Sequence, residues 1–135
     1  MEPDETEYPA RTHVSIRIFA PNLLPEEITQ NLELTPNRTH HQSDYPRNDS
    51  KYSAYKHGMW MLNSNIPEDQ PLEEHLNSLL TLLEPKKSYI QSLAKHATVD
   101  FCCTLYAQNG FQVSPQLLKR IADLEITFGV TVYPE

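Results

Sequence analysis

Glycine, cysteine and basic residues are scarce in this chain of 135 residues, and each scarcity disfavours a class of function. Three glycines occur, which leaves little material for a glycine-rich phosphate-binding loop. The two cysteines, Cys102 and Cys103, are adjacent and so provide no ordinary disulfide framework. Eleven basic residues against eighteen acidic ones give a net charge of −7, which argues against binding along a nucleic-acid backbone.

Long apolar runs are missing as well. No segment approaches the roughly 20 residues that span a bilayer, and the N-terminus MEPDETEYPA is acidic where a secretory signal would have a basic start. We therefore expect a cytoplasmic protein without a membrane segment or a nucleic-acid partner. The 39% of hydrophobic residues suffice for one core. We expect a flexible lead-in over 1–11 and a single domain over 12–135.

Alternation of apolar and polar residues predicts the strands of this domain. Segments with one apolar face are found at 13–19, 58–64, 98–107 and 126–133. In the last of them, Ile126, Phe128, Val130 and Val132 are expected to face inward. Because every strand has one apolar face, helices should cover one side of the sheet only.

Helical spacing and turn residues predict the remaining elements. A short helix is expected at 23–34, and a longer one over 69–96, where Pro85 should interrupt a leucine stripe. Asn109-Gly110 predicts a hairpin turn into a short returning strand at 111–113. Ser114 should then cap a last helix.

The predicted fold is α+β, with a single-layer, largely antiparallel sheet and helices on one face. From Gly58 onward the expected order is β-α-β-β-α-β, the split βαβ arrangement of ferredoxin-like domains. The first strand and helix would be an N-terminal β-α unit added to this core.

Four stretches of the chain, from about Thr12 to Pro134, carry a family resemblance: VSIRIFAPNLLPEEITQNLELTP, HGMWMLNS, LEEHLNSLLTLLEPKK and SPQLLKRIADLEITFGVTVYP. With them the chain resembles the bacterial proteins grouped as domain of unknown function 4279. Pro36, Arg38 and Asp44 fit the family pattern, whereas Asn37 stands where threonine is usual and Ser43 where a glycine is expected. The resemblance implies an α+β fold and a bacterial or phage origin, and it carries no catalytic assignment.

A polar segment at about 35–57 is the longest stretch without a strand or helix pattern. Loops beyond about 12–15 residues in a compact domain are usually functional or disordered. Tyrosine and arginine, both enriched at interface hot spots, make this one a candidate recognition element; a mobile surface excursion is the alternative. The expected binding residues here are Arg38, His40, His41, Asp44, Tyr45, Arg47, His57 and, on the following strand, Trp60.

The same residues suggest a second class of function, a small-molecule or enzymatic site. Arg38 would clamp an anion, a histidine would transfer protons and Trp60 would stack on a ring. No G-x-S-x-G or H-E-x-x-H motif supports catalysis, and adjacent histidines do not easily converge on one metal ion. We therefore favour a protein that is not an enzyme and that uses no cofactor or metal.

The face of the sheet opposite the helices is the second candidate surface. Aromatic and methionine side chains on an uncovered sheet face often contact another chain. Its expected binding residues are His13, Arg17, Phe19, Asp100, Tyr106 and Tyr133. We expect another protein as partner, with an immunity-type neutraliser of a toxin as the most concrete version and a homodimer through this face as an alternative. Two simpler alternatives need no partner: the long loop folds over this face and covers it, and Asp100 only pairs with a cation.

Overall fold

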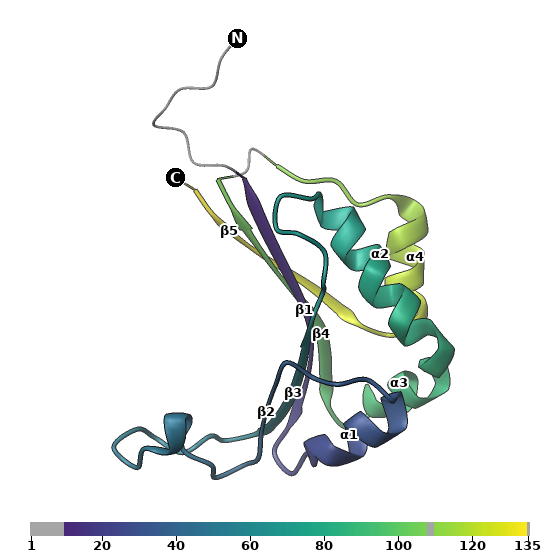
Figure 1. Cartoon of the computed structure of the whole chain (residues 1–135). Helices are drawn as coiled ribbons and strands as arrows, with labels where there is room; N and C mark the ends of the chain where they lie inside the picture. The colour runs from purple at the N-terminus through teal and green to yellow at the C-terminus, as the bar shows by residue number, and fades with distance from the viewer. Residues whose placement is uncertain (1–9, 108–109, 135) are drawn as a thin grey trace.

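A computed structural model describes residues 10–107 and 110–134, which form one open sheet with helices on one side (Figure 1). The strand order is β2-β3-β1-β4-β5. The strands are β1 (Arg11–Ala20), β2 (Arg38–His40), β3 (Gly58–Asn63), β4 (Thr98–Tyr106) and β5 (Thr127–Tyr133). The helices are α1 (Pro25–Leu32), α2 (Leu72–Leu83), α3 (Lys87–Leu93) and α4 (Pro115–Asp123). The predicted α+β fold is confirmed.

The sheet is largely antiparallel. β1 lies at its centre and runs antiparallel to β3 and β4, and β2 runs antiparallel to β3. β4 and β5 are parallel and are joined through α4. With α2 and α3 counted as one interrupted helical segment, the order from β1 to β4 is β-α-β-β-α-β. In the sheet, β3 lies between β1 and β2, and β1 lies between β3 and β4.

Two details of the predicted topology are wrong. Residues 111–113 form no strand, because the chain after β4 passes directly to α4 and returns beside β4 in parallel. The short strand β2 was not predicted. The β-α-β-β-α-β order consequently begins at β1 instead of Gly58, and the added unit is α4 with β5 at the C-terminal side. Asn109 of the predicted turn and residues 1–9 of the lead-in lie outside the described residues; β1 already begins at Arg11.

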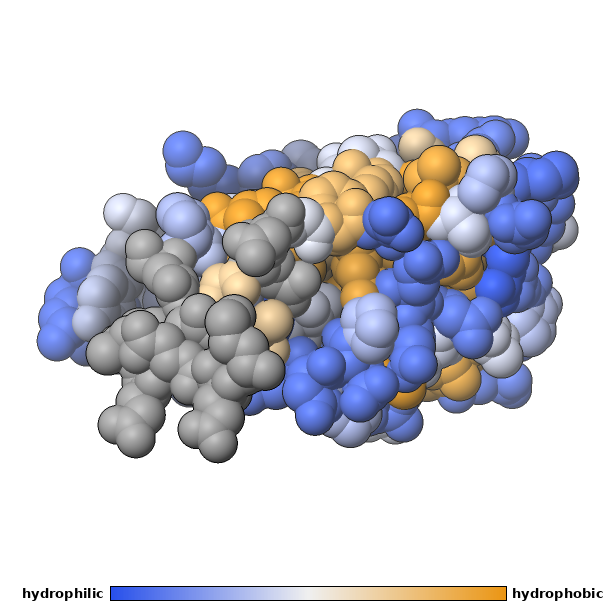
Figure 2. Space-filling view, turned by 90° about the horizontal axis from the view of Figure 1, so that it is seen from above, coloured by the Kyte–Doolittle hydropathy of each residue, from blue (hydrophilic) through white to orange (hydrophobic). Residues whose placement is uncertain are grey.

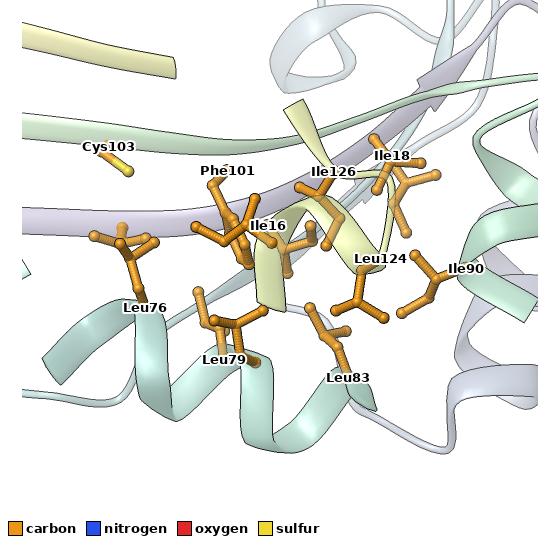
Figure 3. Packing of buried hydrophobic residues seen from close by; sticks show 14 of the residues in the cluster. Ile16, Ile18, Leu76, Leu79, Leu83, Ile90, Phe101, Cys103, Leu124 and Ile126 are labelled. Atoms are coloured by element: carbon orange, nitrogen blue, oxygen red, sulfur yellow. The ribbon is translucent and has the colours of Figure 1, made fainter. Parts of the chain in front are cut away.

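The core lies between the sheet and α2, and it follows the predicted alternation. Ile16 and Ile18 of β1 are fully buried, as is Phe101 of β4. The leucine stripe of α2, with Leu76 and Leu79 at its centre, packs against them (Figure 3). Each inward side chain on a strand requires an outward neighbour, so this packing fixes which residues the opposite face displays.

Local signals set the ends of the helices. Pro85 interrupts the long helical segment as predicted, with a 3₁₀ turn over Glu84–Lys86 between α2 and α3. Ser114 caps α4, since its hydroxyl accepts the Leu117 N–H at 3.2 Å. Gly58 is required at the start of β3, because a Cβ there would lie 2.2 Å from the Leu23 carbonyl oxygen.

β5 departs from the expected burial. Ile126 is buried, and Phe128 and Val130 are partly buried against the core, but Val132 is 47% exposed. Its position at the edge of the sheet explains the difference, because only β4 neighbours it. In the described part of the chain no helix is long and apolar enough to cross a membrane.

Two leucines of α2 that differ in exposure, Leu79 and Leu82, offer a matched test of this packing. Replacing the fully buried Leu79 by alanine should lower the free energy of unfolding by about 2–5 kcal/mol, because it removes methyl groups and leaves a cavity. The control is Leu82→Ala in the same helix, where the leucine is 43% exposed. This change should alter the free energy of unfolding by no more than about 0.5 kcal/mol. Equal effects in urea denaturation would contradict the placement of α2.

Candidate functional site

The open face, by which we mean the side of the sheet away from the helices, joins the two predicted groups of binding residues. In β2, Arg38 pairs with Met61 and His40 with Met59. Met61 in turn neighbours Arg17, and Met59 neighbours Phe19 on β1. Arg38 and His40 therefore stand in the same rows as the outward side chains of β1. The sequence alone treats loop and sheet as separate surfaces, and β2 makes them one.

An ion pair lies at the centre of the open face. The Arg17 guanidinium donates from Nε to Asp100 Oδ1 at 2.9 Å and from Nη2 to Asp100 Oδ2 at 2.7 Å. The bidentate hydrogen bond, aided by the carboxylate charge, raises the pKa of Arg17. This confirms the simpler expectation that Asp100 pairs with a cation of the neighbouring strand. Arg17 also lies over the Phe19 ring, 5.4 Å from its centroid.

Aromatic rings occupy the end of the open face where β4 and β5 finish. Tyr106 and Tyr133 stack with 5.2 Å between their centroids, and His13 meets Tyr106 edge-on at 5.8 Å. The His13 imidazole also lies 3.2 Å from a Glu68 carboxylate oxygen. Tyr133 is 50% exposed. These three predicted residues therefore present an aromatic surface to solvent and are not joined to the Arg17–Asp100 pair.

Residues 41–57, here called the arm, follow β2 and project beyond the sheet on the side away from the helices (Figure 1). Two backbone hydrogen bonds join the two sides of the arm. The Ser43 N–H donates to the Tyr55 carbonyl at 2.9 Å, and the Tyr55 N–H donates to the Asp44 carbonyl at 2.8 Å. Ser43 has a φ of 73°, a left-handed conformation that favours glycine. A glycine, which the family resemblance leads one to expect here, would adopt this conformation without the strain that serine incurs.

Several predicted residues fix the arm at its base. His40 stacks on Tyr55 with 3.5 Å between ring centroids, and Arg38 Nη2 donates to the Tyr55 hydroxyl at 3.3 Å. Partial burial lowers the pKa of His40, so the stacked imidazole is neutral at pH 7. His41 contacts Glu26 of α1 through Nε2, and its backbone N–H donates to Asp44 Oδ2 at 2.8 Å.

A small hollow of about 240 Å³ lies between β2 and the arm. Its lining brings together five of the predicted residues and adds Thr39, Asn48 and Tyr55, which are not among the expected binding residues. The predicted residues are Arg38, His40, Asp44, Tyr45 and Arg47. Within the described ranges, no carboxylate lies within 4.0 Å of the Arg38 or Arg47 guanidinium. The hollow is therefore suited to an acidic group.

Three residues of the predicted loop group lie outside the hollow: His41, which contacts Glu26, and Trp60 and His57. Trp60 is fully buried and donates from Nε1 to Thr29 Oγ1 at 3.0 Å, so it belongs to the core under α1 and does not line the hollow. Alternation along β3 turns Trp60 inward, opposite to Met59 and Met61. His57 meets the Phe19 ring edge-on at 5.9 Å and does not line the hollow. Residues 10–107 and 110–134 contain no group of three or more side chains placed to bind a metal ion.

The sequence also gave no indication of His75. It is 1% exposed in the first turn of α2, and its Nδ1 lies 2.5 Å from Ser64 Oγ. It borders a hollow of about 270 Å³ between β1 and the segment after β3, where His13 lines the outer side. Burial lowers the pKa of His75, although the carbonyls of Gln70 and Pro67 act in the opposite direction.

This burial predicts a pH dependence. An unfolded chain has His75 near its ordinary pKa of 6.5, whereas folded His75 resists protonation. Below pH 6.5 the unfolded state therefore binds more protons, and the free energy of unfolding should fall as the pH is lowered. His75→Gln should flatten this dependence in urea titrations, while His96→Gln at an exposed position should leave it unchanged. An unchanged slope in His75→Gln would contradict the expected shift.

Comparison with known proteins places the chain in one family. A model of domain of unknown function 4279 matches residues 10–135, nearly the whole chain. No curated protein and no solved structure shows a match. The chain belongs to the domain of unknown function 4279 family.

Proposed function

We propose that the protein is a non-enzymatic binding module that recognises another protein through the arm and the open face. The observation that carries this proposal is the pairing of β2 with β3, which continues the outward rows of the sheet into the arm. A partner that contacts Arg38 and His40 would also reach Phe19 and Arg17. Such a surface combines aromatic, methionine and arginine side chains, which are enriched at protein interfaces.

Charge defines the kind of partner. The arm with β2 has four basic residues, Arg38, Arg47, Lys51 and Lys56, and two acidic ones, Asp44 and Asp49, in a chain whose net charge is −7. We expect an acidic group of the partner to enter the hollow between Arg38 and Arg47, because guanidinium groups bind carboxylates with two parallel hydrogen bonds. The rest of the chain, outside the arm and β2, is acidic and would contact a basic part of the partner.

An immunity-type protein that neutralises a toxin is the most concrete version of this function. The support is general: a small acidic domain, an exposed recognition surface and a family resemblance that implies a bacterial or phage origin. Homodimerisation through the open face is the competing use of the same surface. The alternative of a small-molecule or enzymatic site is weaker, since Trp60, which was expected to stack on a ring, is buried in the core and lies outside the hollow.

Affinity capture from a lysate of the source organism tests the proposal. The wild-type chain should retain a stoichiometric protein. Arg38→Ala/Tyr45→Ala/Arg47→Ala should weaken its binding at least tenfold, about 1.4 kcal/mol, because these exposed residues form the contact.

The matched control removes two cations and one large apolar group from the helix side. Leu82→Ala/Lys87→Ala/Lys95→Ala changes exposed residues and should bind like the wild type. Equal retention by both triple variants would contradict recognition by the arm. If no protein is retained, a binding module is excluded and a ligand screen becomes the next step.

A further inference from the structure

The two edges of the sheet differ in how they are protected. β2 is three residues long and contains Arg38 and His40, and the chain turns away from it into the arm. β5 spans seven residues, Thr127–Tyr133, without a charged residue or a proline. Over the described parts of the chain, β4 is the only strand that pairs with β5. Proteins usually protect a long edge strand by a charged residue, a proline, a bulge or a covering segment. β5 has neither a charged residue nor a proline.

Apolar side chains accompany this edge. Val132 and Tyr133 are 47% and 50% exposed, and Leu118 of α4 is 47% exposed. Arg120 of α4 faces α2, because its Nη1 donates to Asn77 Oδ1 of α2 at 2.7 Å. Residues two apart on a helix lie roughly 160° from one another, so Leu118 lies on the side of α4 away from α2, towards the β5 edge.

Figure 2 shows hydrophobic side chains at the surface in the middle of the end of the molecule that it views, with hydrophilic side chains around them. Soluble proteins rarely leave a large contiguous apolar patch in water unless it contacts another molecule. The combination of free backbone groups on β5 with neighbouring apolar side chains calls for a partner that supplies both a strand and an apolar surface.

We propose that β5 pairs with β5 of a second copy of this chain, antiparallel about a twofold axis near Val130. The pairing would join the five strands of each copy into one continuous sheet. An antiparallel twofold pair keeps both helix layers on the same side, so that Leu118 of each copy faces the other across the seam. No charged side chain of β5 enters the seam, so the pairing sets no like charges of the two strands directly opposite one another.

The protection of the other edge determines where assembly stops. A twofold contact uses the same surface on both copies and is closed. After β5 pairs with β5, the outer edges of the joined sheet are the two β2 strands, which are short and contain Arg38 and His40. The expected product is a dimer, and its open faces remain free for the proposed partner.

Sedimentation velocity over a concentration series tests this inference with the chain alone. The wild type should approach twice the chain mass of 15.6 kDa. Val132→Lys and, independently, Leu118→Lys should shift the dimer to monomer at concentrations where the wild type is dimeric. Both positions are exposed, and far-UV circular dichroism should confirm that each variant is folded. Thr39→Lys on β2, exposed at the opposite edge, is the matched control and should remain dimeric.

Three outcomes would overturn the inference: a wild-type monomer at every concentration, an open polymer, or a dimer that Thr39→Lys dissociates while Val132→Lys leaves it intact. A wild-type monomer would mean that a second copy does not occupy the β5 edge. Another protein, or the residues outside the described ranges, would then be the next occupant to test. These results are independent of the capture experiment, because neither Val132 nor Leu118 is among the residues proposed for recognition.

Discussion

The fold depends on the burial of one side of β1 and β4 beneath α2. Ile16, Ile18 and Phe101 are fully buried against the leucine stripe, and strand geometry then forces their neighbours to the other side. Arg17 and Asp100 meet on the open face for this reason. An aspartate inside a strand is unfavourable, and the bidentate contact with Arg17 on the adjacent strand offsets part of that cost. The packing of the core therefore determines which side chains of β1 and β4 lie next to one another in the candidate site.

The same register positions the arm. β3 is fixed beside β1 by the burial of Trp60 and by the close approach of Leu23 to Gly58. β2 needs only three residues to align Arg38 and His40 with the outward methionines of β3. Beyond His40 the arm depends on its own contacts, chiefly the His40–Tyr55 stack and the backbone bonds between residues 43–44 and 55. A rigid sheet thus presents a loop whose base is tightly defined.

Residues governed by period and by local chemistry could be predicted from the sequence. Alternation identified the inward faces of β1 and β4, the leucine stripe identified α2, and Ser114 identified the start of α4. Features that depend on distant pairing could not. β2 is short and polar and forms only because β3 offers a partner, and residues 111–113 form no strand although Asn109-Gly110 suggested a hairpin into them. Trp60 and Val132 were misplaced because the covering helix and the sheet edge are tertiary features.

The central claim is that the open face is uncovered in the isolated chain and becomes covered when the partner binds. Met59 and Met61 lie on this face, and with Met1 they are the only methionines of the chain. Methyl NMR with a soluble paramagnetic probe therefore reports on the face directly. We predict strong relaxation of the Met59 and Met61 methyls in the free protein and its loss in the complex. Protection of both methyls in the free monomer, or unchanged relaxation in the complex, would contradict the proposed recognition surface.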